Sequence, residues 1–270
     1  CALRAETLSK ARQATAVRKK PIMANLPPKI LTAFNNQLGL RSNPKQIASI
    51  ICNEFGIPIS QQTIYRYIWE DRNNGGKLYK YLRRKSKKIR HKSKLVKVRI
   101  NNKKSIDLRL KRIVLMMTAG HWEVDTIFGL DQKSFLLTMV DIATMYTIIV
   151  KLPNKEAATI EAAINSVIAS SLLPFLSITS DNGTEFANHE NISAKNNIDW
   201  FFCHPYCSGE RGLNENTNGL IRDFYPKRTD FRLVPDEDIK EVQNILNTRP
   251  RERIGFIRPA HAMVTHLMAA

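Results

Sequence analysis

Three carboxylates in the second half of the chain have residue types and positions that suit metal-dependent chemistry. Asp125 lies in an apolar stretch typical of a strand, Asp181 directly follows another apolar stretch, and Glu215 lies in a helical segment rich in amides and arginines. A charged side chain inside an apolar strand is costly unless it is paired or metal-bound. Hard divalent cations such as Mg²⁺ bind carboxylate oxygens, and two such ions can promote phosphodiester cleavage. The three acids therefore indicate a metal-dependent phosphoryl-transfer site.

The elements that must position these acids follow from the hydropathy pattern of the second half. Three antiparallel strands, a helix, two further strands and two helices are expected at 121–130, 135–142, 146–152, 156–171, 175–179, 198–203, 213–224 and 236–247. Asp181 would then lie in a Ser-Asp-Asn-Gly turn that exposes it at the edge of the sheet. This order predicts an α/β fold: a ribonuclease-H-like core with a mixed five-stranded sheet and helices.

The charge of the chain is concentrated in its first part. The net charge is +18, and residues 1–120 contain 28 of the 42 Lys and Arg residues but only 5 of the 24 Asp and Glu residues. Such a basic region favours a polyanionic partner, and nucleic acid is the leading candidate. A basic protein of the membrane surface is the rival interpretation. We expect no membrane partner, because no long cationic amphipathic helix is found and the apolar run at 135–150 is interrupted by Asp141.

Residues 42–70 have the pattern of a helix-turn-helix. Pro44 can begin a first helix, Gly56 can end it, and Ser60 can cap a second helix over 61–70. Any helical hairpin shares this pattern, but the basic surroundings favour DNA recognition. The polar residues that begin the second helix are the candidate DNA contacts: Gln61, Gln62, Thr63 and Arg66.

The composition also predicts domain boundaries. We expect a helical DNA-binding region over 1–76, which includes a helical pattern over 1–20, then a basic linker over 77–120 and a catalytic domain over 121–270. The basic run at 83–88 is typical of a solvated linker, and such a linker can also contact phosphates.

Several longer motifs surround the three acids, and 33 residues separate Asp181 from Glu215. With these motifs the chain resembles the DDE transposases of the insertion sequence 30 family over nearly its whole length, most strongly at 121–259. The residues that carry the resemblance are Trp122-Glu123-x-Asp125, Asp181-Asn182-Gly183-x-Glu185-Phe186, Glu210-Arg211-Gly-x-Asn214-Glu215-Asn216-x-Asn218-Gly219-Leu-x-Arg222, Pro226-Lys227, Asn247-x-Arg249-Pro250-Arg251 and the helix-turn-helix ending Thr63-Ile64-Tyr65.

The resemblance implies a function and its participants. Asp125, Asp181 and Glu215 would be the catalytic, metal-binding triad of an integrase-like core, with two Mg²⁺ ions, or Mn²⁺, per active site. The enzyme would cleave DNA at insertion-sequence ends and transfer the 3′-hydroxyl to target DNA without a covalent protein–DNA intermediate. Its partners would be double-stranded DNA, both terminal inverted repeats and target, and further copies of itself on that DNA. A bacterial cytoplasmic location, associated with the nucleoid, is expected.

Further residues of these motifs are candidates for supporting roles. Glu123 shares a strand face with Asp125, so it is expected beside the metal ligands, and a structural hydrogen bond is the alternative. Asn182 and Asn214 are expected beside the metal ligands as well. The candidate DNA contacts, for which surface solvation is the alternative, are Arg211, Asn218, Arg222 and Lys227.

Two departures from the family pattern leave alternatives open. The chain begins after the point where the family has an additional helix-turn-helix, and Gly209 stands where the family usually has Trp. One alternative is therefore a catalytically inactive, truncated copy that acts only as a DNA-binding protein. Another is a ribonuclease-H-like nuclease that acts on RNA–DNA hybrids.

Overall fold

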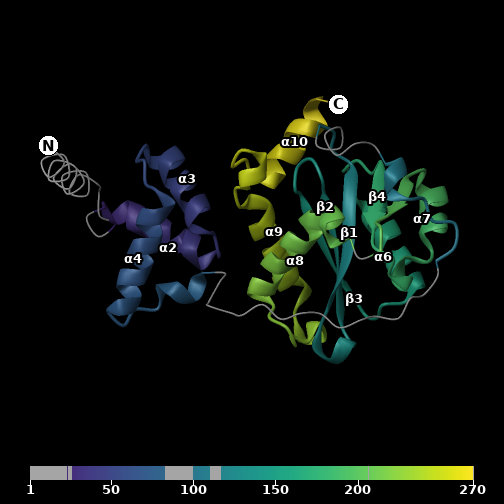
Figure 1. Cartoon of the computed structure of the whole chain (residues 1–270), viewed down its shortest axis with the longest axis horizontal. Helices are drawn as coiled ribbons and strands as arrows, with labels where there is room; N and C mark the ends of the chain where they lie inside the picture. The colour runs from purple at the N-terminus through teal and green to yellow at the C-terminus, as the bar shows by residue number, and fades with distance from the viewer. Residues whose placement is uncertain (1–22, 24–25, 83–99, 110–116, 206, 270) are drawn as a thin grey trace, which may run out of the picture. The chain divides into compact units, whose positions relative to one another are not determined.

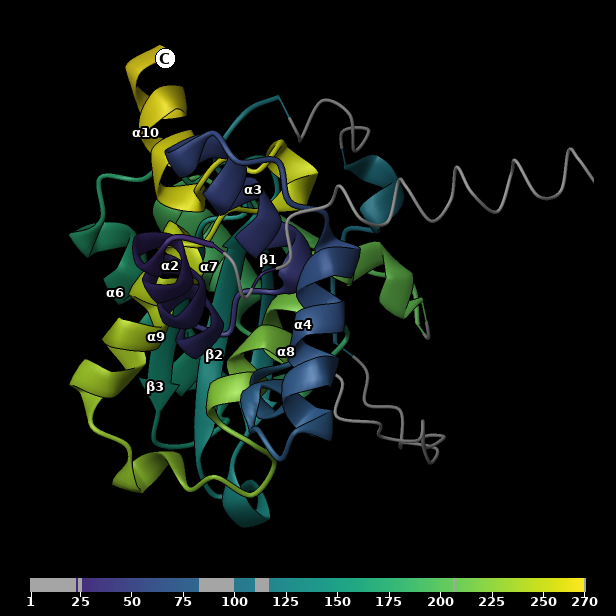
Figure 2. The same cartoon turned by 90° about the vertical axis from the view of Figure 1, so that its left-hand side faces the viewer.

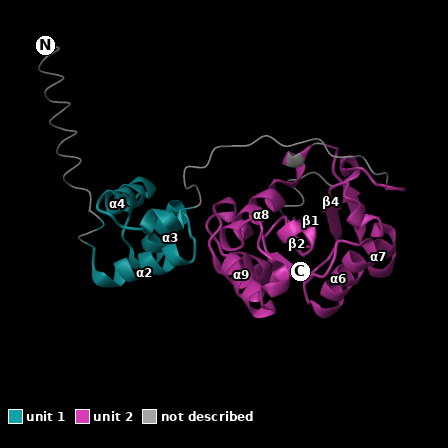
Figure 3. Ribbon diagram, turned by 90° about the horizontal axis from the view of Figure 1, so that it is seen from below, with its two compact units in different colours: residues 1–88 teal, residues 89–270 magenta. Residues whose placement is uncertain are grey.

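The protein forms two compact units, residues 1–88 (unit 1) and 89–270 (unit 2), shown in Figure 3. This computed structural model describes residues 23, 26–82, 100–109, 117–205 and 207–269. The expected helix over 1–20 and the basic run at 83–88 lie outside the described residues. Of the described residues in the expected linker, 77–82 fall in unit 1, whereas 100–109 and 117–120 fall in unit 2. The predicted domain boundaries stay predictions.

Unit 1 consists of three packed helices in its described part (Figure 2). They are α2 (Pro28–Gly39), α3 (Pro44–Phe55) and α4 (Gln61–Asn73), followed by a 3₁₀ turn over Leu78–Tyr81. Their apolar faces meet in one core, whose fully buried members are Phe34, Leu38, Ile47, Ile51, Ile64 and Ile68. Burial of these side chains is the main stabilising contribution to a helical unit of this size.

The ends of α3 and α4 follow from local chemistry. The Asn43 side chain accepts bonds from the backbone of Lys45 and Gln46, and the Gln46 side chain accepts from the Asn43 backbone N–H, so a capping box starts α3. Gly56 ends α3 in the left-handed region, with φ 68°. The Ser60 hydroxyl accepts from the Thr63 backbone and caps α4. The predicted two-helix pattern is therefore present, whereas its role in DNA recognition stays a prediction.

The centre of unit 2 is a mixed five-stranded sheet in the order β3-β2-β1-β4-β5. Figure 1 labels β1, β2, β3 and β4 of this sheet. Its strands are β1 (His121–Phe128), β2 (Phe135–Asp141), β3 (Thr147–Leu152), β4 (Ser177–Ser180) and β5 (Asp199–Phe202). The first three pair antiparallel, whereas β4 lies parallel to both β1 and β5. This is the sheet that the sequence predicts, with ends shifted by one or two residues.

Helices cover both faces of this sheet (Figure 1). One face packs on α6 (Ala157–Ser170) and α7 (His189–Asn196), and the core there includes Trp122, Val124 and Ile164. The other face packs on α8 (Gly212–Phe224) and α9 (Asp236–Thr248), with Ile127 and Leu246 between them. A last helix, α10, spans Pro259–Ala269. None of the helices in the described part of the chain has the length and apolar character to cross a membrane.

Candidate active site

The sheet brings Asp125 and Asp181 to one level. Glu123 of β1 lies opposite Thr179 of the parallel strand β4, so the two aspartates lie two residues further along: Asp125 within β1, where it is paired with Thr138 of β2, and Asp181 just after β4 ends. The carboxyl end of a parallel strand is where such sheets place ligand-binding groups. Burial raises the pKa of Asp125 above its ordinary value; Arg211 opposes the rise, and the nearby charge of Asp181 adds to it.

The guanidinium group of Arg211 lies between these two carboxylates. One of its nitrogens is 3.4 Å from Asp125 Oδ1, and the other donates to Asp181 Oδ2 at 3.1 Å. The first nitrogen also donates to the Val124 carbonyl at 3.0 Å. Burial alone would lower the pKa of Arg211, but the charges of Asp125 and Asp181 raise it. Arg211, expected at the DNA surface, is thus placed as the counter-charge of the acid pair.

Asp125 is oriented by several further bonds. The Asn218 amide of α8 donates to Asp125 Oδ2 at 2.8 Å, and the Thr138 hydroxyl of β2 donates to the other end of that amide at 3.0 Å. The backbone N–H of Thr126 donates to Asp125 Oδ1 at 2.9 Å. On the Asp181 side, the Gly183 N–H donates to Oδ1 at 2.9 Å. Both aspartates are therefore held in defined orientations.

Glu215 lies apart from this pair. It is exposed in the first turn of α8, one turn before Asn218, whose amide touches Asp125. In the described ranges, no group of three His, Cys, Asp or Glu side chains is placed to hold a metal ion. The structure thus gathers two of the three predicted acids and places the third on the helix that contacts them.

Of the three residues expected beside the metal ligands, Glu123 and Asn182 make side-chain contacts within the protein, whereas the buried side chain of Asn214 has no hydrogen-bond partner among the described residues. Glu123 is buried, and its carboxylate accepts from the backbone N–H of Asn214 at 3.3 Å, which links β1 to the start of α8. Asn182 donates from its side chain to the Cys203 carbonyl at 2.7 Å and accepts from Lys103 at 2.7 Å. These bonds join the elements that carry the acids.

A buried ion pair that the sequence analysis missed supports the Asp181 loop. Glu185 is only 4% exposed, and its carboxylate contacts Lys155 Nζ at 2.8 Å and the Thr126 hydroxyl at 3.0 Å. A Cβ on Gly183 would lie 2.2 Å from Glu185 Oε2 and 2.9 Å from Asp181 Oδ1. A side chain at this position would therefore displace one of these two carboxylates. The only sequence signal was the presence of Glu185 in the Asp-Asn-Gly-x-Glu-Phe motif.

A second missed feature fixes the segment that carries Arg211. His204 contacts the Glu210 carboxylate through its Nδ1 at 2.8 Å and its backbone N–H at 2.8 Å, while Nε2 contacts Asp107 at 3.0 Å. Hydrogen bonds to Glu210 and Asp107 raise the pKa of His204. This Asp107–His204–Glu210 cluster connects residues 105–109 to the 3₁₀ turn Ser208–Arg211.

The remaining candidate DNA contacts differ in their exposure and in their contacts within the protein. Gln61, Gln62 and Arg66 are exposed on α4, as a DNA contact requires, whereas Thr63 is buried with its hydroxyl 2.9 Å from that of Ser60. In unit 2, the guanidinium of Arg222 donates to the Phe128 carbonyl, and Lys227 is exposed. Their role in DNA binding stays a prediction.

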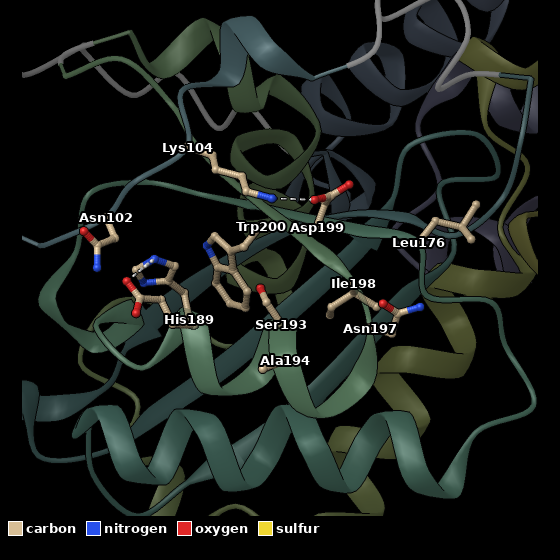
Figure 4. A pocket seen from close by; sticks show the side chains of 11 residues that line it. Asn102, Lys104, Leu176, His189, Ser193, Ala194, Asn197, Ile198, Asp199 and Trp200 are labelled. Carbon is tan, nitrogen blue, oxygen red and sulfur yellow. Dashed lines mark hydrogen bonds and ion pairs between the residues drawn. The ribbon is translucent and has the colours of Figure 1, made fainter.

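A cavity of about 430 Å³ lies away from these acids, between α7, β5 and residues 102–104 (Figure 4). His189 and Trp200 line it, and Lys104 pairs with Asp199 across its rim at 2.8 Å. None of the three predicted catalytic acids lines this cavity. The candidate active site is thus the edge of the sheet around Asp125 and Asp181.

Comparisons with known proteins agree on the family. The family model described as "Integrase core domain" matches residues 117–208, and with the sheet order it confirms the predicted ribonuclease-H-like core. The transposase for insertion sequence element IS4351 of Bacteroides fragilis is 42% identical over 219 residues, which cover 80% of this chain and 67% of that protein. Transposase InsI for insertion sequence element IS30A of Escherichia coli strain K12 is 32% identical over 260 residues, covering 90% and 67%. A solved catalytic core domain of BIV integrase aligns with TM-score 0.44 and 18% identity, covering 55% of this chain and 96% of that one. The chain belongs to the insertion sequence 30 family of transposases.

Proposed function

We propose that this transposase cleaves DNA at insertion-sequence ends and transfers the 3′-hydroxyl to target DNA at a site formed by Asp125, Asp181 and Glu215. The three acids would hold two divalent ions, Mg²⁺ or Mn²⁺. The observation that carries the proposal is the acid pair at the sheet edge, where Arg211 supplies the positive charge that the pair needs. When bound, the ions would supply activation of the attacking oxygen and stabilisation of the leaving oxygen.

The residues present fit such ions. Two carboxylates supply hard oxygen ligands, which Mg²⁺ prefers, and their mutual repulsion contributes to the raised pKa of the largely buried Asp125. A positive group already lies between them, which supports a cation at this position. Glu215, exposed one turn before Asn218 on α8, could join them by a movement of its side chain.

The surrounding residues have roles that follow from their contacts. Asn218 and Thr138 orient the Asp125 carboxylate, and the Gly183 N–H orients that of Asp181. Holding reactive groups in one geometry removes part of the entropic barrier to reaction. Arg222 and Lys227, on and just after α8, would help to neutralise the phosphates of bound DNA.

Unit 1 would contribute DNA recognition. The exposed side chains of Gln61, Gln62 and Arg66 begin α4, the position of a recognition helix. The basic charge of residues 1–120 would attract the phosphate backbone. Because transposition joins two element ends to one target, we propose a homo-oligomer on DNA, acting in the bacterial cytoplasm.

An assay of strand cleavage and strand transfer tests the proposal. We expect the protein to cleave DNA that carries the element ends, and to join the product to target DNA, in Mg²⁺ or Mn²⁺ and not in EDTA. The reason is that the acids alone can neither activate nor stabilise the phosphodiester oxygens without cations. Cleavage that is undiminished in EDTA, binding of end DNA with no cleavage, or cleavage of RNA–DNA hybrids without strand transfer would each contradict it.

A further inference from the structure

We infer that Arg211 is an internal counter-cation, which occupies the metal position between Asp125 and Asp181 and must leave it before a divalent ion binds. The inference rests on the metal site proposed above and adds a step to it. Arg211 would thereby act as a positioning residue that keeps the acid pair assembled in the metal-free protein.

The contacts of Arg211 are those of a substitute cation. Its two terminal nitrogens approach one oxygen of each aspartate, at 3.4 and 3.1 Å, so a single group bridges both carboxylates. The planar guanidinium suits such bridging, because its nitrogens can serve two acceptors at once. The Arg211 side chain is 13% exposed, against 24% for Asp125 and 42% for Asp181. The guanidinium is therefore largely shielded from water although the Asp181 side chain is exposed, and it covers oxygens that a metal ion would need.

A metal ion and this guanidinium cannot share those oxygens. Two positive groups within a few ångströms repel each other, most strongly where water is excluded. Removal of Arg211 without a replacement would instead leave two repelling carboxylates. Exchange of one cation for the other keeps the charge of the site balanced.

The backbone that carries Arg211 is held in place. Glu210, the preceding residue, is anchored by both the ring and the backbone N–H of His204. On either side, a Cβ built on Gly209 or Gly212 meets no atom within 4 Å, so the chain is not crowded at these two glycines. In the inferred displacement the Arg211 side chain changes its rotamer while this anchored turn stays folded.

The test is the affinity of the full chain for Mn²⁺ without DNA, measured by isothermal titration calorimetry. We expect Arg211→Gln, which removes the charge, to bind Mn²⁺ about tenfold more tightly than the wild type, because no cation has to be displaced. Arg222→Gln is the matched control: it removes the same charge from α8, where the side chain contacts the Phe128 carbonyl and neither aspartate. Its Kd is expected within about twofold of the wild type.

Thermal unfolding gives a readout that a merely structural role would not produce. In EDTA, Arg211→Gln should have a lower Tm than the wild type, because Asp125 and Asp181 then repel each other. Saturating Mn²⁺ should raise the Tm of the variant more than that of the wild type. If Arg211→Gln does not fold, Arg211→Lys is measured in its place. An ammonium group is a point charge that bridges two carboxylates less well than a guanidinium. The Mn²⁺ affinity of Arg211→Lys should therefore also exceed that of the wild type.

Failure of this inference can be distinguished from failure of the metal site. A folded Arg211→Gln whose Kd for Mn²⁺ equals or exceeds the wild-type Kd overturns the counter-cation role. Adding Asp181→Asn to that variant then examines the site itself. If the double variant loses Mn²⁺ binding, the metal site at Asp181 is supported and only the counter-cation role of Arg211 is rejected. If its Mn²⁺ binding is unchanged, both the metal site and the counter-cation role are rejected.

Discussion

Replacing Asp125 or Asp181 by asparagine is expected to reduce strand cleavage by about a thousandfold, because a bound metal supplies several kcal/mol of transition-state stabilisation and each 1.36 kcal/mol is worth tenfold in rate. Asparagine keeps the size of the side chain, so the fold should survive. The measurement is single-turnover cleavage of end DNA in Mg²⁺, with circular dichroism to check folding. The two positions should behave alike, because both carboxylates contact the same guanidinium group, that of Arg211.

A matched control for this loss is Asp199→Asn. Asp199 begins β5 in the same sheet, but its side chain is 59% exposed and pairs with Lys104 away from the catalytic acids. The cleavage rate of this variant should lie within about threefold of the wild type, since exposed ion pairs contribute little. A rate within tenfold of the wild type for Asp125→Asn or Asp181→Asn would reject the proposed roles of these acids.

The largest expected effect on stability is that of Glu185→Ala. This change leaves Lys155 without the carboxylate that contacts it at 2.8 Å, in a position where the lysine side chain is only 29% exposed. Breaking a fully buried ion pair costs about 3 kcal/mol or more. Lys155 is partly exposed and also lies over the Phe128 ring, so the expected loss here is about 2 kcal/mol. The measurement is the free energy of unfolding in urea, monitored by tryptophan fluorescence of unit 2, where Trp200 packs near Phe186.

Two further variants make this prediction specific. Glu190→Ala removes a carboxylate whose side chain is 55% exposed, and the free energy of unfolding should change by less than about 0.5 kcal/mol. Combining Glu185→Leu with Lys155→Met should restore part of the stability, because an apolar pair of similar volume leaves no unpaired charge. A loss below about 1 kcal/mol in Glu185→Ala would mean that the pair contributes no more than a surface one.

The fold could be predicted from the sequence where elements carry a strong apolar pattern. Four of the five strands alternate or run apolar over their lengths, and β4 follows the apolar residues Phe175 and Leu176 although only Ile178 within it is apolar. Capping residues such as Ser60 and Gly56 marked helix ends. Helix α7 was missed because it is short and polar, with only His189 and Ile192 buried. Helix α10 was missed as well: its described buried residues are Pro259 and Met263, too few to give a clear period.

The active site was predictable only in part, for a physical reason. Asp125 within β1 and Asp181 just after β4 are brought together by the pairing of two strands, which the hydropathy pattern locates. The partner of Arg211 was not predictable, because the arginine reaches Asp181 30 positions away and the Val124 carbonyl 87 positions away. Such contacts depend on the packing of α8 against the sheet, so a sequence pattern shows the charge but not what it neutralises.

The most direct test of the central claim is the metal dependence of Asp181→Cys. A thiolate is a soft ligand that the oxygen-seeking Mg²⁺ binds poorly and that Mn²⁺ accepts better. If Asp181 holds a catalytic metal ion, strand cleavage by this variant is lost in Mg²⁺ and restored by about tenfold or more in Mn²⁺, whereas Asp181→Asn stays inactive in both. Cleavage by Asp181→Cys in Mg²⁺ at the wild-type rate would contradict the account.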